Sequence, residues 1–535
     1  MADRQGAGAS AAADLAARAA QTHVVVIGGG VGGLIAAREC AKVGMRVTVL
    51  ESSDAVGGAI RRTELDGIAL DAGAESYATR GGHVRALVEE LGLADLIVAP
   101  AAGGAWLAGI PGTGAAPLPV GGVLGIPSNP FQEDVRRIIG WSGAWRAYLD
   151  RVRPPLTIGH QLSLGRLVAS RMGPKVRDRL VAPVTTGVYS ASPDDVDVDV
   201  AAPGLNAALT RVGSLSGAVM ALRQDGAARK SPGAAVEGLV GGMGALVDAL
   251  LDDLGRFDTT VRIGTRVEQL SRDAGGWRVR TRSAAPAADA AMDAAIDDES
   301  PAAPAPAPAA DPGTPLDLAA ELEDDLTAEA VIVATDELSA RALLSPVVAA
   351  LAAGEEEAAV VAPEIEVVTL LLDAPALDAA PRGTGVLTVP GSHIAKALTH
   401  STAKWEWVRA AADGRHVVRV SFGAQGEPAA TAALDDDAAA ALALREASAL
   451  LGIPLDPPAL IAAHRARYVQ AQPASLIGSG ERRAAARAAV QAVPGLAAVG
   501  AWLAGTGLAQ VIPDAVAEAD RLRHEILWNR SDAPD

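Results

Sequence analysis

The fold is decided by residues 23–33, which read HVVVIGGGVGG. The β-branched run at 23–27 is typical of a buried parallel strand. It passes directly into glycines that fit the pattern G-x-G-x-x-G, with Gly28, Gly30 and Gly33 at its three glycine positions. A strand that runs into this loop predicts a Rossmann-type nucleotide-binding unit.

Each of these glycines has a steric reason. Gly28 allows the tight turn, Gly30 lets the backbone approach a pyrophosphate, and Gly33 lets the next helix pack closely on the strand. We expect that helix over residues 34–43, and its N-terminus, with Val31 and Gly32, offers free N–H groups and a positive dipole end to phosphates. The pattern favours dinucleotide binding over an empty glycine-rich turn.

A second strand is expected over residues 46–50, and it ends at Glu51. This acid lies about 20 residues beyond the loop, where a carboxylate accepts hydrogen bonds from both ribose hydroxyls. Ser52 follows it in the predicted cofactor site. Strand, loop, helix, second strand and acid therefore follow one another in the order and spacing of a dinucleotide-binding unit.

A second glycine pair favours FAD over NAD. Gly57 and Gly58 follow the acid and lead to Arg61 and Arg62, where an NAD domain usually continues into another strand–helix unit. A glycine pair followed by a basic residue resembles the extended FAD fingerprint of amine-oxidase-like flavoproteins. That resemblance implies that Arg61 or Arg62 lies near the pyrophosphate.

Composition excludes several classes of protein. The chain has 535 residues and a net charge of −18, without the basic face that nucleic acid needs. Its single cysteine, Cys40, excludes an intrachain disulfide and an all-cysteine metal site. No apolar run reaches the ~18 residues that span a bilayer, although peripheral membrane contact stays open. Residues 1–21 lack the pattern of a secretory signal, so we expect a disordered extension of a cytoplasmic protein.

Shifts in composition and pattern predict an α/β fold combined with α+β parts. The expected units are a discontinuous FAD-binding domain at 22–105, 236–345 and 490–535, a mostly helical insert domain at 106–235, and a substrate-binding α+β domain at 346–489. Residues 283–326 are rich in Ala, Pro, Asp and Glu and contain no aromatic residue. Such a segment buries too little apolar surface to order itself, so we expect a disordered and dispensable insertion.

A glycine loop recurs near the end of the chain. Gly505, Thr506 and Gly507 precede an expected helix over residues 508–526. In a two-domain flavoprotein the positive end of this helix can face the flavin ring and stabilise negative charge on its reduced form. The alternative is a simple capped terminal helix. For the cluster at 241–244, a plain helix start is the prediction.

Taken together, residues 22–526 resemble the bacterial protoporphyrinogen/coproporphyrinogen oxidase family, apart from the insertion. The segments that carry this resemblance are RMGPK at 171–175, PVTTGVYS at 183–190, AKA at 395–397, KW at 404–405, RVSFG at 419–423 and AGTGL at 504–508. Three departures concern the substrate cavity rather than the flavin site. Tyr468 stands where the family often has Trp, QPAS at 472–475 stands for M-P-Q-Y, and Gly81 stands for a basic residue.

The resemblance implies a set of noncovalent FAD contacts. They are Gly28, Gly30, Val31, Gly32, Gly33, Glu51, Ser52, Gly57, Gly58, Arg61, Gly73, Ala74, Glu75, Ser76, Val267, Gly505, Thr506, Gly507 and Leu508.

The resemblance also implies a reaction in haem biosynthesis. A porphyrinogen loses six electrons in three steps, each a hydride transfer to flavin N5, and three O2 become three H2O2. Coproporphyrinogen III is the expected substrate, protoporphyrinogen IX a second one, and a ferrochelatase a transient partner that takes the product. Arg80 is the candidate that binds a propionate. No residue is assigned as general base, and no histidine has metal-ligand spacing.

Three alternatives remain at this point. A flavin amine oxidase of the same fold needs an aromatic cage, which 4 Tyr and 3 Phe supply poorly. A carotenoid desaturase would carry an apolar membrane-binding patch. A lipid- or prenyl-carrier module on the FAD fold would lack flavin chemistry, and the complete phosphate fingerprint argues against it.

Overall fold

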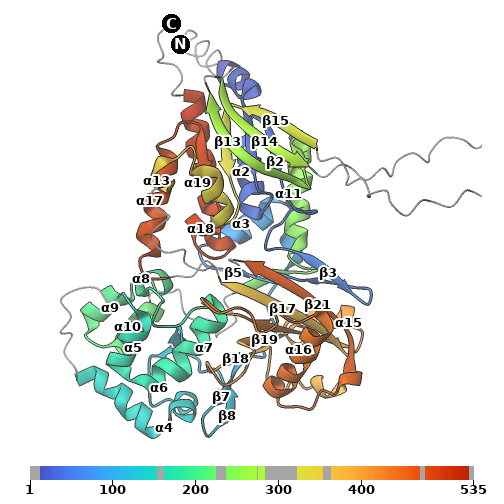
Figure 1. Cartoon of the computed structure of the whole chain (residues 1–535). Helices are drawn as coiled ribbons and strands as arrows, with labels where there is room; N and C mark the ends of the chain where they lie inside the picture. The colour runs from blue at the N-terminus through green and yellow to red at the C-terminus, as the bar shows by residue number, and fades with distance from the viewer. Residues whose placement is uncertain are drawn as a thin grey trace, which may run out of the picture.

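The computed structural model describes residues 13–152, 162–224, 236–273, 275–283, 322–352, 363–469 and 476–528. Three parts are visible in Figure 1: a parallel sheet with its covering layers at the top, an antiparallel-rich sheet at the lower right, and a helical lobe at the lower left. The described ends of the chain lie together at the top.

The first part is a five-stranded parallel sheet. Its strands, in spatial order, are β12 (Thr260–Arg262), β2 (Arg46–Leu50), β1 (His23–Ile27), β16 (Ala330–Val333) and β22 (Leu496–Ala498). Side chains alternate between its faces. Val24 and Val26 pack with α2 (Val31–Ala41), α11 (Gly244–Arg256) and α19 (Leu508–Trp528), whereas Val25 and Ile27 pack under a second sheet.

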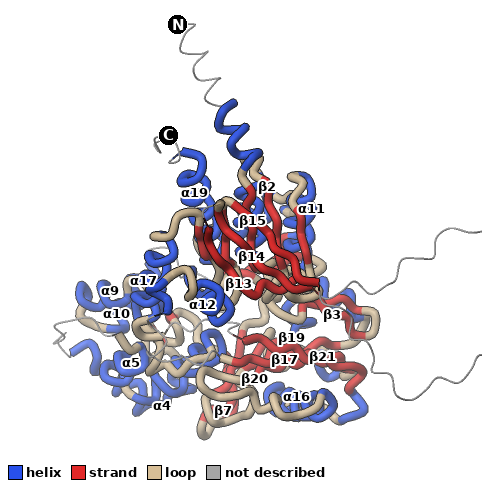
Figure 2. Tube along the Cα trace, turned by 45° about the horizontal axis from the view of Figure 1, so that its top comes forward, coloured by secondary structure: helices blue, strands red, loops and turns tan. Residues whose placement is uncertain are grey.

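That second sheet is antiparallel and covers the other face (Figure 2). It consists of β13 (Thr265–Asp273), β14 (Gly276–Ser283) and β15 (Leu322–Ala328). Ser283 pairs with Leu322, so residues 322–326, expected within a disordered insertion, belong to a strand. Their acidic composition gave no sign of a pairing that only β14 supplies. Residues 284–321 lie outside the described residues.

The second part is a seven-stranded sheet. Its order is β21 (Leu460–Val469), β17 (Glu364–Leu372), β20 (His416–Phe422), β19 (Ala397–His400), β18 (Gly385–Thr388), β7 (Ala105–Ile110) and β8 (Gly114–Pro117). The helix α16 (Asp436–Leu451) packs on it. Residues 106–117 were expected in the helical insert, but they pair in this sheet instead. Nothing local predicts that β7 pairs with a strand about 280 residues later.

The helical lobe follows β8. Its helices are α4 (Glu133–Tyr148), α5 (Leu164–Met172), α6 (Pro174–Val176), α7 (Ala182–Val184), α8 (Val198–Ala201), α9 (Leu205–Val212) and α10 (Leu215–Gln224), with π-helical turns at Arg177–Val181 and Thr185–Tyr189. Inside it the Arg171 guanidinium binds the fully buried Asp150 carboxylate at 2.6 Å. Within the described ranges no single helix is long and apolar enough to cross a membrane, and only α9 with α10, bent by 116°, passes that test as a pair.

Shorter elements connect these parts. They are β3 (Arg62–Leu65), β4 (Ile68–Asp71), β5 (Tyr77–Ala78), α3 (His83–Glu90), β6 (Ile97–Val98), β9 (Gly122–Val123), β10 (Ile126–Pro127), β11 (Val236–Leu239), α12 (Glu337–Leu344), α13 (Ala349–Ala352), α14 (Ser401–Lys404), α15 (Glu406–Ala412), α17 (Ser479–Gln491) and α18 (Ala501–Ala504), with 3-10 turns at Ala94–Leu96, Leu149–Val152, Pro375–Leu377 and Pro457–Ala459.

The start of the chain differs from the expected disordered extension. Residues 13–21 form a helix. Ala19 is buried beside α19, and the Arg18 guanidinium donates to the carbonyl of Leu527 at 3.0 Å. Alanine favours helix, but docking on the last helix of the chain stabilises this one, and no local pattern announces that contact. Residues 1–12 lie outside the described part.

Candidate functional site

The glycine loop has the geometry that its sequence pattern predicts. Gly28 has φ +109°, and its N–H donates to the carbonyl of Leu50 at 2.7 Å. A Cβ on Gly33 would lie 2.0 Å from the carbonyl oxygen of Gly28, so only glycine lets α2 sit this close. A Cβ on Gly30 would meet no atom within 4 Å. Gly30 is therefore not needed for packing, and the open space above it fits a phosphate approaching the first N–H groups of α2, at Val31 and Gly32.

The second glycine pair lies directly on the first loop. The N–H of Gly57 donates to the carbonyl of Gly29 at 2.8 Å, and a Cβ on Gly58 would lie 3.2 Å from the Cα of Gly30. The exposed Arg61 stays beside this pair, with its Nε donating to the carbonyl of Gly58 at 3.3 Å. Arg62 turns away and pairs with Asp248 on α11. Of the two arginines, Arg61 is thus the one beside the glycines.

Glu51 ends β2 beside the glycine loop. Its Oε2 accepts from the N–H of Gly29 at 2.7 Å, and its Oε1 accepts from the N–H and hydroxyl of Ser53 at 2.8 and 2.7 Å. The side chain of Ser52 is exposed, 3.5 Å from Oε1. The residue is half-buried, and its carboxylate fixes the glycine loop through Gly29.

The closing loop reaches the same place from the end of the chain. Gly505 and Gly507 have φ of +100° and +92°, and α19 begins immediately after them at the half-buried Leu508. A Cβ on Gly32 would lie 3.1 Å from Val511, so α19 packs against the N-terminal end of α2. Two helix N-termini therefore meet here. Val267 is half-buried on β13, on the other side of the parallel sheet.

The segment 73–76 joins the two sheet-centred parts. Gly73 must be glycine, because a Cβ there would lie 2.0 Å from the carbonyl oxygen of Ala59 and 2.9 Å from the hydroxyl of Tyr468. Ala74 donates its N–H to that same carbonyl at 3.2 Å. Gly73 is thus held between the second glycine pair and β21 of the seven-stranded sheet.

Glu75, predicted as a cofactor contact, directs its carboxylate at the seven-stranded sheet. It binds Lys404 Nζ at 2.6 Å and the Arg419 guanidinium at 3.0 Å, and Ser401 donates its hydroxyl at 3.2 Å. Burial alone would raise the pKa of this carboxyl, but the two cations outweigh it and lower the pKa to about 2. Any cofactor contact by Glu75 is therefore left to its backbone, and the same segment includes the half-buried Ser76.

Several buried polar atoms at this boundary have no hydrogen-bond partner among the residues that the structure describes. They are Tyr468 Oη, Thr369 Oγ1 and Arg419 Nε. Thr369 and Arg419 pair directly across β17 and β20, and they share one face of the sheet. Buried polar atoms are nearly always hydrogen-bonded, so this face suits a polar or ring-bearing ligand lying between it and the glycines. The residues present thus fit a flavin and a substrate.

Asp71 plays a role that the sequence did not reveal. Its carboxylate accepts from the N–H of Met243 at 2.9 Å, at the start of α11, and a Cβ on Gly242 would lie 2.8 Å from it. Burial raises the pKa of this carboxyl to about 6. The plain helix start expected at 241–244 therefore also binds a buried carboxylate. This contact anchors the segment before Gly73.

Two arginines are available to bind an anionic substrate. Arg80 is exposed, follows β5, and lies near Tyr189 of the PVTTGVYS segment. Arg483 on α17 is half-buried, with its guanidinium 3.0 Å from the Cβ position of Gly505. Neither guanidinium makes a hydrogen bond or ion pair with another described residue. Arg483 was missed, because nothing in the run ERRAAARAAV distinguishes one helical arginine from the others.

Lys396 is the second cation that the sequence pattern did not explain. It is buried where the helical lobe meets the seven-stranded sheet, and its Nζ donates to the hydroxyl of Ser190 at 2.5 Å. Burial lowers its pKa to about 7. Both residues belong to segments that carried the resemblance, AKA and PVTTGVYS. The departure noted at 472–475 lies outside the described residues.

The structure therefore brings most of the predicted cofactor residues together. The first glycine loop contacts both the pair Gly57 and Gly58 and the carboxylate of Glu51. The closing loop packs on α2, and segment 73–76 contacts Ala59, which follows the glycine pair. Arg80 lies near Tyr189 of the helical lobe. The cations Lys404 and Arg419 were quoted only as motif residues, and their common partner is 329 and 344 positions away from them.

Comparison with known proteins identifies the family. The model of the flavin-containing amine oxidoreductases matches residues 31–296. Coproporphyrinogen III oxidase of Mycobacterium tuberculosis (strain H37Rv) is 30% identical over 514 residues, covering 93% of this chain and 95% of that protein. The enzyme of the same name from Propionibacterium freudenreichii is 29% identical over 284 residues, covering 48% and 54%. A crystal structure from Exiguobacterium sp. 255-15, named as a protoporphyrinogen oxidase, shares the fold with a TM-score of 0.72, 22% identity and coverage of 95% and 99%. The chain belongs to the coproporphyrinogen III oxidase family of flavin-containing amine oxidoreductases.

Proposed function

We propose that this chain binds FAD noncovalently and oxidises coproporphyrinogen III to coproporphyrin III, with protoporphyrinogen IX as a second substrate. The observation that carries the proposal is one boundary, where the nucleotide-binding glycines meet the buried polar face around Arg419 and Tyr468. It occurs in a chain that aligns with a coproporphyrinogen III oxidase over 93% of its length. A carrier module without flavin chemistry would have no use for this combination.

Noncovalent binding is supported by the only cysteine. Cys40 is buried inside α2, and burial raises the pKa of its thiol to about 12, so it neither reaches a flavin nor ionises to attack one. Acid precipitation of the purified protein should release all of the yellow colour into the supernatant. Colour that stays with the pellet would show a covalent link and refute this part of the proposal.

The protein's own residues bind the cofactor, orient the substrate and exclude water from the site. Gly28–Gly33, Gly57 and Gly58 would hold the pyrophosphate, Glu51 the ribose, and Gly505–Leu508 the ring end of FAD. The bound flavin supplies two-electron oxidation, so the six electrons of the substrate require three rounds. We assign Arg80 and Arg483 to hold its propionates, since guanidinium pairs well with carboxylate.

The deciding experiment uses the FAD-loaded enzyme with each porphyrinogen and follows porphyrin fluorescence and oxygen uptake together. We expect three O2 consumed and three H2O2 formed per porphyrin, with higher kcat/KM for coproporphyrinogen III. Without oxygen, only a stoichiometric amount of flavin should be reduced. A flavin-loaded enzyme that oxidises neither porphyrinogen, yet is reduced by an amine, would replace this proposal with a flavin amine oxidase.

One cellular consequence belongs to the same proposal. A cytoplasmic enzyme that makes coproporphyrin III must pass it to a metal-inserting enzyme, so we infer a transient hand-off to a ferrochelatase. Adding a purified coproporphyrin ferrochelatase should shorten the lag before metalloporphyrin appears, relative to product first diluted into buffer. An unchanged lag would show free diffusion instead.

A further inference from the structure

The hydroxyl of Tyr468 is buried at the candidate site without a hydrogen-bond partner among the described residues. Tyr468 lies near the end of β21, and its Oη is shielded from solvent. Buried polar atoms are nearly always hydrogen-bonded, because an unpaired hydroxyl in the interior costs stability. A phenylalanine would fill the same space without that cost. The hydroxyl therefore indicates a ligand that is bound beside it.

This hydroxyl lies against the segment that carries predicted flavin contacts. A Cβ on Gly73 would lie 2.9 Å from Tyr468 Oη and 2.0 Å from the carbonyl oxygen of Ala59. Ala59 directly follows the glycine pair Gly57 and Gly58 in the sequence. Gly73 and Ala59 thus connect the hydroxyl with the glycines that we propose to bind the pyrophosphate.

The position of Tyr468 fits the flavin half of the cofactor rather than its adenosine half. Backbone and side-chain contacts run from Glu51 to Gly29 and from Gly29 to Gly57. They continue from Ala59 to segment 73–76, against which Tyr468 lies. A cofactor with its adenosine ribose on Glu51 and its pyrophosphate on the glycines therefore extends its flavin half toward Tyr468.

The hydroxyl keeps its proton in these surroundings. Burial raises the pKa of Tyr468 above the usual value of 10, while the charges of Arg419 and Arg61 act in the opposite direction and that of Asp71 adds to the rise. Arg61 stays beside the second glycine pair, and Arg419 belongs to the seven-stranded sheet. The hydroxyl thus lies between the two sides of the site as a neutral group, able to donate one hydrogen bond and accept another.

A second unpaired donor lies beside the same segment. The terminal nitrogens of Arg419 bind the carboxylate of Glu75 and the carbonyl of Gly73, but its Nε has no partner among the described residues. Arg419 is only 8% exposed. Two buried polar groups beside one stretch of backbone suit a ligand with several acceptors, such as the ring carbonyls of a flavin or the hydroxyls of its ribityl chain.

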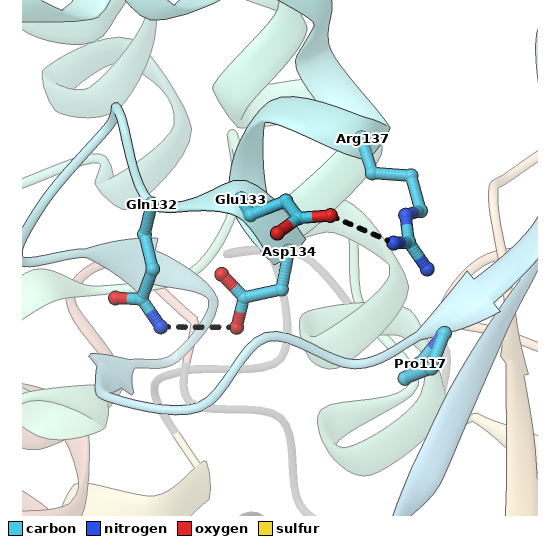
Figure 3. A pocket seen from close by; sticks show the side chains of 5 residues that line it. All are labelled: Pro117, Gln132, Glu133, Asp134 and Arg137. Carbon is cyan, nitrogen blue, oxygen red and sulfur yellow. Dashed lines mark hydrogen bonds and ion pairs between the residues drawn. The ribbon is translucent and has the colours of Figure 1, made fainter.

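The hollow drawn in Figure 3, at the start of α4, gives no comparable indication of a ligand. Its Glu133 carboxylate pairs with Arg137 at 3.2 Å. The Asp134 carboxylate accepts from the side-chain amide of Gln132 at 3.1 Å. These polar groups bind one another, whereas the hydroxyl of Tyr468 is left for a ligand.

We propose that the hydroxyl of Tyr468 hydrogen-bonds the flavin half of bound FAD and positions it against the seven-stranded sheet. Tyr468 stands where the related oxidases often have Trp, so this hydroxyl is a feature of this chain. The proposal rests on the FAD binding proposed above, but it does not depend on which porphyrinogen is oxidised.

The test compares the apoproteins of wild type and Tyr468→Phe, which lacks only the hydroxyl. The Kd for FAD should rise about three- to tenfold, as expected for the loss of one neutral hydrogen bond. The Tm of the apoprotein should stay the same or rise, because the variant buries no unpaired oxygen. ADP lacks the flavin half, so it should compete with FAD uptake at the same Kd in both proteins.

Tyr77→Phe is the matched control. Tyr77 is 3% exposed, and its hydroxyl donates to the Glu237 carboxylate at 3.0 Å, so its partner lies within the protein. This variant should lower the Tm of the apoprotein and leave the Kd for FAD within about twofold of wild type. The two tyrosines should therefore give opposite patterns of stability and cofactor affinity.

The visible absorption band of the bound flavin locates the hydrogen bond further. A band that shifts in Tyr468→Phe places the bond on the flavin ring, and an unshifted band with weaker binding places it on the ribityl chain. Equal Kd for FAD in wild type and Tyr468→Phe would overturn the proposal, and a raised KM at equal Kd would assign the hydroxyl to the substrate instead. A lower Tm of the Tyr468→Phe apoprotein would also overturn it, because the hydroxyl would then have a partner within the protein.

These outcomes are separate from those of the proposed function. A wild-type protein that binds FAD more tightly than Tyr468→Phe does, yet oxidises no porphyrinogen, would overturn the proposed reaction and leave the role of Tyr468 standing. A wild-type protein that takes up no FAD would overturn both.

Discussion

The two sides of the candidate site are built by different means. On the nucleotide side, Gly28, Gly33 and Gly57 make backbone contacts with residues that lie close to them in the sequence. The closing loop is the exception on this side, because it comes from the far end of the chain. On the substrate side, Glu75 is held by Lys404 and Arg419, more than 300 positions away. The first side is a local pattern with steric reasons, whereas the second is a set of side-chain pairs that exists only after folding. Substitutions should therefore affect the two sides differently.

Removing the charge of Glu75 should have the largest effect on stability. Glu75→Gln leaves Lys404 and Arg419 buried without their shared counter-charge, and breaking a buried ion pair in this way costs about 3–5 kcal/mol. Urea unfolding of FAD-loaded protein measures it. The matched control is Arg62→Gln, which breaks the exposed pair with Asp248 and should cost less than about 1 kcal/mol. Equal losses in the two variants would contradict the stabilising role of the ion pairs that Glu75 makes with Lys404 and Arg419.

The same carboxylate makes stability depend on pH. Its pKa in the folded protein, about 2, lies below the usual value of 4.5, so the folded state binds fewer protons than the unfolded state between these values. Its contribution is fully present above about pH 4.5 and is lost as pH falls toward 2. Glu75→Gln should therefore flatten the stability profile in this acidic window. If the stability profiles of wild type and variant stay parallel in this window, Glu75 is not the group responsible for the acid-induced loss.

Glu51 should affect cofactor binding more than folding. Glu51→Ala removes the carboxylate proposed to bind ribose and should weaken FAD by about 2–4 kcal/mol, measured by titrating the apoprotein. The same change also frees the N–H of Gly29, which Glu51 now accepts. Ser53→Ala separates the two effects, because it loosens the carboxylate without removing it and should leave FAD affinity within about 1 kcal/mol of wild type. Unchanged affinity in Glu51→Ala would show that another group binds the ribose.

The nucleotide side could be predicted in detail, and the substrate side could not. Gly28, Gly30 and Gly33 were assigned from a pattern whose geometry is local, and β1, β2 and the closing loop were expected where they lie. The pairing of β7 with β18 and the burial of Asp71 at α11 needed the tertiary fold. Nothing in the sequence distinguished Arg483, and Lys396 was quoted only as part of the AKA segment, because burial is a property of the folded chain alone.

A pair of glycine substitutions separates packing from binding within one loop. Gly33→Ala places a methyl group 2.0 Å from a carbonyl oxygen and should cost about 1–3 kcal/mol of stability, with loss of flavin. Gly30→Ala meets no atom within 4 Å, so the apoprotein should be as stable as wild type while FAD binding falls. Thermal unfolding of both apoproteins, together with flavin content, gives the answer. Equal destabilisation of the two would show that Gly30 is a packing residue.

The substrate side can be sharpened by comparing its two arginines. If Arg80 holds a propionate, Arg80→Ala should raise KM for coproporphyrinogen III about tenfold with kcat nearly unchanged, as expected for loss of a charge-assisted hydrogen bond. Arg80→Lys should recover part of the loss. Arg483→Ala tests the residue beside Gly505 by the same assay. A rise in KM for Arg483→Ala alone would move propionate binding to the closing loop.

The smallest effect on function is expected from the long insertion between β14 and β15. Ser283 and Leu322 are paired neighbours in the antiparallel sheet, so a short Gly/Ser turn can join them without moving either strand. Replacing residues 284–321, and leaving strand residues 322–326 in place, should therefore keep turnover and flavin content within error. Stability should stay equal or rise by up to about 2 kcal/mol, because the shorter loop costs less entropy to close. Removal that extends through residue 326 should instead lower stability, because it takes away five of the seven residues of β15. Loss of flavin on removing 284–321 alone would mean that the segment docks on the nucleotide side.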